Sequence, residues 1–190
     1  MKVHILYPFK EGSWGGGNQL LKALKVFFQK VDVYSESLIE SDVVIFNANP
    51  SALIEYHDLI YTIKKNKPDI SVFVRINGPV FLIRNDDLEI DRAFYMLCSD
   101  IADGVIYQSL WSKNNNSMLG SNKKNNETVI INAPDKNIFN IRADVGVIKG
   151  KPRIVATSWS SNIRKGFDIY KWMDENLDFD KYDMVFIGNS

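Results

Sequence analysis

The sequence predicts an α/β protein built on a doubly wound parallel sheet. Short apolar runs of strand length alternate along the chain with amphipathic segments of helical period. Strands that alternate with helices are joined by right-handed crossovers, which gives a parallel, Rossmann-like sheet covered by helices on both faces. The pattern lapses before residue 150 and then restarts, so we expect the beginning of a second Rossmann-like domain at the end of the sequence.

Each element follows from local pattern and from breaking residues. Asn49 and Pro50 can start a helix, and Pro68 ends it. In a first domain (residues 1–150) we expect strands at 3–7, 31–34, 43–47, 71–76, 104–109 and 128–133 and helices at 20–29, 52–67, 88–98 and 111–119, with a loop between residue 79 and the helix at 88. In the second (residues 151–190) we expect strands at 153–157 and 184–188 around a helix at 167–176.

A glycine-rich turn joins the first strand to the first helix. Gly15, Gly16 and Gly17 leave backbone N–H groups uncovered where a helix begins, and a helix N-terminus favours anions. The spacing fits neither the dinucleotide fingerprint, which would need glycine at Leu20, nor the phosphate loop that ends in Gly-Lys-Ser/Thr. The turn is therefore either an anion site of another kind or simply a wide bend.

Polar residues follow several of the predicted strands. Arg75 and Asn77 come at the end of the strand at 71–76, and Gln108 and Asn132 end later strands. Open parallel sheets bind ligands beyond the carboxyl ends of their strands. We therefore expect these side chains and the glycine turn to line one crevice. The alternative for Arg75 is a salt bridge at a strand end.

Composition excludes several classes of function. Lys plus Arg and Asp plus Glu both number 23, so no global charge attracts nucleic acid. Two histidines and Cys98, which falls in an apolar helical pattern, give no metal-ligand cluster. The apolar start is too short for a signal peptide, and no transmembrane segment is predicted. We expect a cytoplasmic protein.

Four segments together resemble the group-1 retaining glycosyltransferases, which have the two-Rossmann (GT-B) fold. The first two are the glycine triplet before the first helix and residues 102–114, ADGVIYQSLWSKN. The third, Asn132-Ala133-Pro134-Asp135, is similar to the family's entry into the region between its domains. The fourth comprises residues 154–170, IVATSWSSNIRKGFDIY, and the turn FIGN at 186–189. The resemblance covers the whole chain but about half of such an enzyme.

The resemblance implies transfer of a sugar from a UDP- or GDP-linked donor to a glycan, lipid or small-molecule acceptor, with retention and without a metal. It also allows peripheral contact with a membrane. The implied donor-binding residues are Gly15, Gly16, Gly17, Arg164, Lys165, Gly188 and Asn189, and the implied acceptor-side residues are Arg75 and Asn77.

The chain also departs from the family pattern. Asn77 stands where several members have histidine, and Ser160 where many have arginine. The family's paired glutamates would lie beyond Ser190, so the catalytic residues stay unknown and we expect these 190 residues alone to be inactive. Two rival hypotheses remain. One is a non-catalytic Rossmann-like module that binds a nucleotide or dinucleotide, in which Glu36 would bind a ribose. The other is a degenerate transferase kept as a partner-binding scaffold.

Several singled-out residues also have a purely structural interpretation. Arg164 and Lys165 could be a solvated surface pair, and Asp86 and Asp87 could cap the following helix. Trp111 and Trp159 are expected to pack rather than stack on a sugar, and His57 to be exposed on a helix.

Overall fold

The computed structural model describes residues 1–12, 15–85, 88–119, 126–134, 150–158 and 165–188. The chain divides into two compact units, Met1–Asn132 and Ala133–Ser190. The sequence pattern placed the boundary between the domains at residue 150, and that placement stays a prediction. Each unit is described by itself.

The first unit contains a five-stranded sheet in which every strand is parallel to its neighbours, in the order β1-β2-β3-β4-β5. This confirms the predicted α/β class with a Rossmann-like parallel sheet. The strands are β1 (Val3–Leu6), β2 (Val43–Ala48), β3 (Ser71–Ile76), β4 (Gly104–Tyr107) and β5 (Glu127–Val129).

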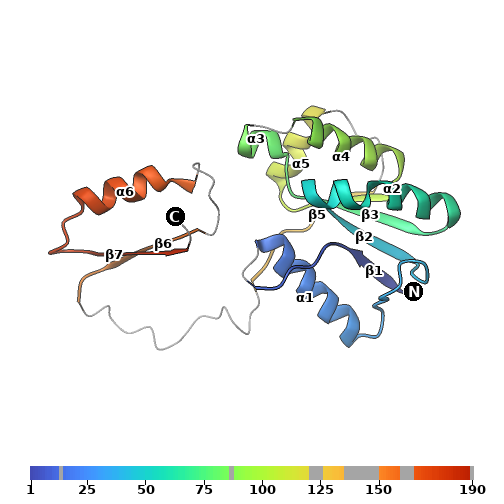
Figure 1. Ribbon diagram of the computed structural model, residues 1–190, viewed down its shortest axis with the longest axis horizontal. Helices are drawn as coiled ribbons and strands as arrows, with labels where there is room; N and C mark the ends of the chain where they lie inside the picture. Colours follow the sequence, from blue (N-terminus) through green and yellow to red (C-terminus); the bar gives the residue numbers. More distant parts are fainter. Residues whose placement is uncertain (13–14, 86–87, 120–125, 135–149, 159–164, 189–190) are drawn as a thin grey trace. The chain divides into compact units, whose positions relative to one another are not determined.

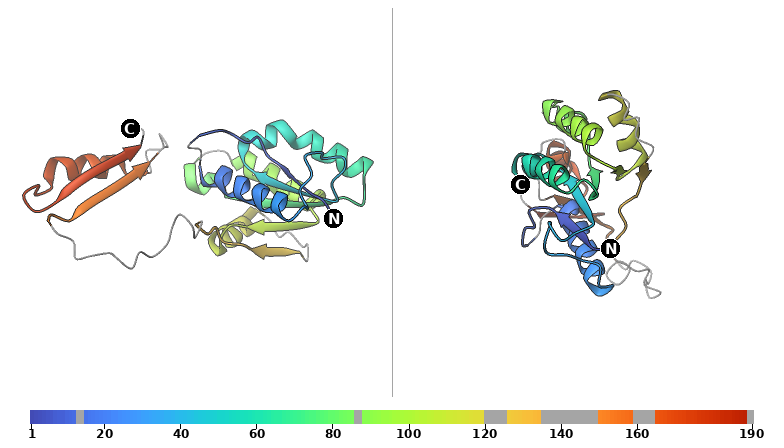
Figure 2. Two further views of the ribbon diagram at one scale, coloured as in Figure 1. Left: turned by 90° about the horizontal axis from the view of Figure 1, so that it is seen from below. Right: turned by 90° about the vertical axis from the view of Figure 1, so that its right-hand side faces the viewer.

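Helices lie on both faces of this sheet. Figures 1 and 2 show α1 on one face and α2, α4 and α5 on the other. The helices are α1 (Gly16–Lys30), α2 (Pro50–Asn66), α3 (Val80–Arg84), α4 (Leu88–Asp100) and α5 (Leu110–Asn116), followed by a 3₁₀ turn, η1 (Ser117–Leu119). The Asn49 side chain caps α2 by accepting a hydrogen bond from Ala52 N (2.9 Å), with Pro50 in the first turn, as the sequence predicts.

The expected strand at residues 31–34 is wrong in extent. Asp32 has a left-handed backbone conformation (φ 55°), which ends extended structure there, and a single bridge joins Tyr34 to Val3. That bridge lies on the opposite side of β1 from β2, because Val3 also pairs with Val43. The chain thus turns one way after β1 and the other way after β2, which makes the gap between these strands a topological switch point.

The two faces of the sheet differ in burial. Facing α2 and α4, apolar side chains from β2, β3 and β4 form the buried core with helix residues such as Phe94 and Cys98. On the other face α1 contacts β1, and its Leu21 is fully buried. Over β3–β5 this face has a hollow of about 510 Å³ lined by Phe73, Ile106, Ile130 and their neighbours. Among the described helices of the first unit, α1 alone lies on this face, so the coverage of the face within this unit is less complete than expected.

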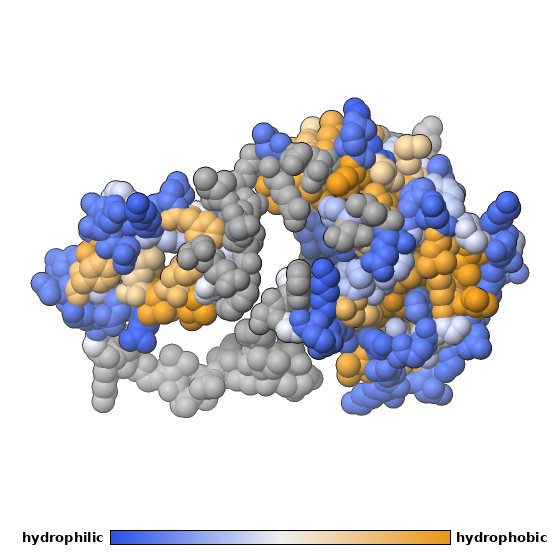
Figure 3. Space-filling view, in the orientation of Figure 1, coloured by the Kyte–Doolittle hydropathy of each residue, from blue (hydrophilic) through white to orange (hydrophobic). Residues whose placement is uncertain are grey.

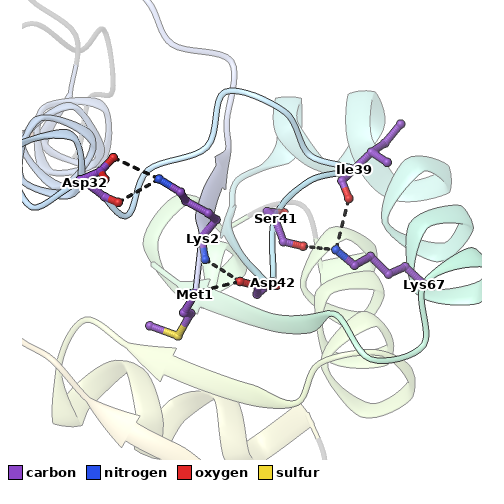
Figure 4. Close-up of polar contacts among 7 residues, drawn as sticks. All are labelled: Met1, Lys2, Asp32, Ile39, Ser41, Asp42 and Lys67. Atoms are coloured by element: carbon purple, nitrogen blue, oxygen red, sulfur yellow. Dashed lines mark hydrogen bonds and ion pairs between the residues drawn. The ribbon is translucent and has the colours of Figure 1, made fainter.

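Charged side chains make contacts at the amino edge of the sheet, the side on which the parallel strands begin (Figure 4). Asp42 Oδ2 accepts a hydrogen bond from Lys2 N at 2.6 Å, and Lys2 Nζ pairs with Asp32 Oδ1 at 3.1 Å. Lys67 Nζ donates to Ser41 O at 2.6 Å. These contacts fix the segments that enter β1 and β2.

Two other local expectations need correction. Residues 80–84, expected in a loop, form the short helix α3, which Asn85 ends in a left-handed conformation (φ 62°). Strand β5 ends at Val129, so it is shorter than the strand expected to reach residue 133. Ile130 and Ile131, which follow it, are exposed. Asp86 and Asp87, expected to cap α4, lie outside the described residues.

The second unit contains a pair of parallel strands, β6 (Arg153–Ser158) and β7 (Asp183–Gly188), and the helix α6 (Phe167–Asn176). Phe186 packs against Phe167 and Tyr170, with ring centroids 5.9 and 5.8 Å away. Other apolar side chains of this unit, such as Val155 and Ile187, remain exposed. Figure 3 shows apolar surface on this unit. In neither unit is a described helix both long and apolar enough to cross a membrane.

Candidate functional site

The candidate site lies where β2 and β3 end. Asn47 and Arg75 are paired neighbours across these two parallel strands. Arg75 alternates with Val74 and Ile76, which belong to the core on the α2 and α4 side, so Arg75 and Asn47 are on the face that carries α1. Both are buried: 4% of Arg75 and 1% of Asn47 is exposed.

The Arg75 guanidinium is surrounded by asparagine amides. Its Nη1 donates to Asn47 Oδ1 at 2.7 Å and also to Asn77 Oδ1, and its Nη2 donates to Asn132 Oδ1 at 2.7 Å. No carboxylate of the described residues lies within 4.0 Å of the guanidinium. The salt bridge that was the alternative for Arg75 therefore does not form within the described part of the chain. Burial without a counter-charge lowers the pKa of Arg75.

The turn after β3 is fixed by side chains from neighbouring elements. Gly78 O accepts hydrogen bonds from Ser112 Oγ and from Asn116 Nδ2 (2.9 Å), both on α5. Gln108, at the end of β4, donates to Asn77 O. The backbone that carries Asn77 is therefore held in place on the side of β4 and α5.

A buried carboxylate holds the other end of this turn. Asp91 on α4 accepts hydrogen bonds from Val80 N at 2.8 Å and Phe81 N at 2.7 Å, the first N–H groups of α3. An acidic group at a helix start satisfies donors that have no partner within the helix. Asp91 is 3% exposed and serves the turn rather than Arg75.

The glycine turn approaches the same amides. Asn18 binds Lys10 through both amide atoms (Oδ1 to N 3.0 Å, Nδ2 to O 2.9 Å), which closes the loop before α1. Gly15 occupies the N-cap position, and no side chain caps the helix. A Cβ added at Gly17 would lie 3.8 Å from both Asn47 Nδ2 and Asn77 Nδ2. The start of α1 therefore lies beside the asparagine pair, at the switch point.

The site presents hydrogen-bond donors. Neither Asn47 Nδ2 nor Arg75 Nε has an acceptor among the described residues. The first N–H groups of α1 add further donors beside them. Such an arrangement suits an anion or a ligand rich in oxygen atoms.

The structure brings together several residues that the sequence placed at one crevice. Arg75, Asn77, Gln108 and Asn132 are joined by hydrogen bonds, with Gly17 beside them. Their role in binding stays a prediction. Gly15 and Gly16 are exposed at the start of α1, and a Cβ at either would meet nothing within 4 Å.

The predicted residues of the second unit are described in part. Lys165 is exposed just before Gly166, the N-cap of α6. Gly188 ends β7 with φ 144°, and an added Cβ would lie 1.7 Å from Ser158 O, so only glycine fits there. Arg164, Asn189 and Trp159 lie outside the described residues.

The remaining predictions have mixed outcomes. Glu36, the ribose ligand of the dinucleotide hypothesis, pairs with Lys25 (Nζ to Oε2 2.9 Å). Trp111, expected to pack, is 49% exposed, whereas Cys98 is buried, as predicted. His57, expected to be exposed, is half-buried. The described part of the chain contains no group of His, Cys, Asp and Glu side chains that could hold a metal ion.

Sequence reasoning missed Asn47, Asn18 and Asp91 as members of this site. Asn47 had one signal, since it is a polar residue at the end of an otherwise apolar buried strand. A comparison of the sequence with protein-family models and with curated proteins gives no match.

Proposed function

We propose that the protein is a glycosyltransferase, or the amino-terminal portion of one, that uses a nucleotide-sugar donor and retains the configuration of the sugar. The observation that carries this proposal is the position of Gly17 beside the Asn47 and Asn77 amides, at the switch point of a parallel sheet. Open α/β sheets bind ligands at such points. The four sequence segments that resemble group-1 glycosyltransferases supply the reaction class.

In this proposal the glycine turn binds the donor, and Arg75 with Asn77 lies on the acceptor side. A helix N-terminus contributes about 0.3–1 kcal/mol to anion binding. A donor bound at about 0.1 mM requires roughly 5.5 kcal/mol. Charge-assisted contacts must therefore supply much of the affinity, and Arg164 and Lys165 of the second unit are the residues proposed for them. They would also stabilise the charge that develops on the leaving nucleotide diphosphate.

The test is a titration of the full chain with UDP- and GDP-sugars, followed by amide resonances. We expect shifts at Gly15, Gly16 and Gly17 and weaker binding in an Arg164→Ala, Lys165→Ala double variant. A Lys171→Ala, Lys181→Ala variant, which removes two exposed lysines of the same unit, serves as the control and should bind normally.

NAD separates this proposal from the dinucleotide hypothesis. Shifts of the glycine resonances with NAD, combined with none from any nucleotide sugar, would replace the transferase by a dinucleotide-binding module. Normal donor binding by the Arg164→Ala, Lys165→Ala variant would remove the second unit from the donor site.

A further inference from the structure

The strongest unexplained feature of the molecule is the environment of Arg75. A guanidinium removed from water loses hydration that a carboxylate partner normally replaces. Here three amide oxygens, from Asn47, Asn77 and Asn132, satisfy its hydrogen bonds but carry no net charge. The described residues thus leave one buried positive charge uncompensated.

The side-chain amides that bind Arg75 have their nitrogen atoms on the side of α1. The amides of Asn47 and Asn77 turn their oxygens toward Arg75 and their Nδ2 atoms toward Gly17. Asn77 Nδ2 makes one long bond to Ala48 O (3.4 Å), and Asn47 Nδ2 has no acceptor among the described residues. The N–H groups of these amides therefore face the start of α1 and lie next to a positive charge.

We infer that Arg75, Asn47 and Asn77 form a binding site for a phosphate-class anion that belongs to a substrate. The bound anion supplies a counter-charge that the described residues do not place beside Arg75. Asn47 Nδ2, which has no acceptor among the described residues, donates to its oxygens, together with the first N–H groups of α1. The site does not depend on sugar transfer, so it can be tested whether or not the proposed function holds.

The primary experiment titrates the full chain with inorganic phosphate and follows the Arg75 Nε–H and Gly17 amide resonances. We expect saturable shifts of both, an affinity that falls as ionic strength rises, and an increase in the thermal midpoint. Arg75→Gln should weaken phosphate binding by about tenfold or more, since it removes the positive charge beside the anion. Arg92→Gln, at an exposed arginine paired with Glu89, is the matched control and should leave binding unchanged.

Asn47→Asp is the decisive variant, and it remains informative even if Arg75→Gln fails to fold. It changes one amide to an isosteric carboxylate 2.7 Å from Arg75 Nη1, so the chain provides its own counter-ion. We expect a higher thermal midpoint together with a loss of phosphate binding of about tenfold or more. Phosphate binding that survives Asn47→Asp, or an absence of saturable phosphate binding to the wild-type chain, would overturn the inference.

Saturating UDP identifies the source of the anion. Competition between UDP and inorganic phosphate assigns the site to the phosphates of a nucleotide donor, whereas independent binding assigns it to an anionic acceptor. Either result supports the anion site. Neither result depends on turnover. A chain that binds phosphate at Arg75 but binds no nucleotide sugar would therefore contradict the proposed function and leave the anion site intact.

Discussion

Charged residues are paired differently at the two ends of the parallel strands, called here the amino edge and the carboxyl edge of the sheet. At the amino edge, Asp42 and Asp103 accept hydrogen bonds from backbone N–H groups and lie beside cations, Lys64 Nζ being 2.8 Å from Asp103 Oδ2 (Figure 4 shows the Asp42 side). At the carboxyl edge, Arg75 has amide partners and no carboxylate partner among the described residues. The first edge is satisfied internally and holds the fold, whereas the second retains capacity for a ligand.

The largest expected effect on stability comes from Asp91, the buried carboxylate that closes the turn after β3. Asp91→Ala leaves two N–H groups of α3 without acceptors in a buried setting, and should lower the free energy of unfolding by about 2–4 kcal/mol. Urea unfolding monitored at first-unit amides measures it. Glu89→Ala, an exposed carboxylate on the same helix, is the control and should change stability by less than about 0.5 kcal/mol. An equally small loss for Asp91 would mean that the turn is held by α5 alone.

Asp103→Ala tests the amino edge and should cost less. Asp103 accepts from Val72 N at 2.8 Å and pairs with Lys64, but its side chain is 41% exposed, so solvent screens the ion pair. We expect a loss of about 1–2 kcal/mol by urea unfolding. Asp69→Ala, at an exposed aspartate near the same edge, should have little effect. A loss from Asp103→Ala as large as that from Asp91→Ala would contradict the assumed screening.

A smaller effect should appear on acidification. The hydrogen bond from Lys2 N, aided by the nearby amino terminus and Lys67, holds the pKa of Asp42 below its ordinary value of 3.8. A lowered pKa gives stability that is fully present above the unfolded value and is lost as pH falls from about 3.8 through the folded value. Asp42→Asn should therefore flatten the stability profile of the first unit in that acid range. If the free energy of unfolding falls equally with pH in the variant and the wild type over this range, Asp42 does not contribute to the acid dependence.

The smallest effect on stability should accompany a clear effect on binding. Gly17→Ala places a methyl group 3.8 Å from Asn47 Nδ2, an ordinary contact, in a helical turn that tolerates alanine. We expect a change in unfolding free energy of less than about 1 kcal/mol, together with weaker phosphate and nucleotide-sugar binding because the space beside the amides narrows. Gly16→Ala, whose Cβ meets nothing within 4 Å, provides the comparison for stability. Unchanged ligand binding in Gly17→Ala would place the ligand away from these amides.

Much of the fold could be predicted from the sequence because local signals agree with it. The helix α6 spans the predicted residues 167–176, and Asn49 with Pro50 marks the start of α2. The convergence of Arg75, Asn77 and Asn132 also follows from the sequence, because parallel strands bring their carboxyl ends to one edge.

The partner of Arg75 could not be predicted in the same way. Its pairing with Asn47 depends on strand order and register, which join residues 28 positions apart. Asp91 reads as an ordinary residue of an amphipathic helix, and its contact with α3 depends on tertiary packing. Residues 31–34 have strand composition, but the turn at Asp32 leaves Tyr34 alone to bridge β1.

The dipeptide Asn77-Gly78 makes the site prone to slow deamidation, called ageing below. Asparagine before glycine is the pair most prone to deamidation, because glycine lets the next peptide nitrogen approach the side-chain carbonyl. Here the product carboxylate would arise beside Arg75, while the contacts of Gly78 O with Ser112 and Asn116 oppose the movement that cyclisation needs. We expect Ser112→Ala to age faster than wild type in peptide-mapping mass spectrometry, and aged protein to lose phosphate affinity; equal ageing rates would show that the turn gives no protection.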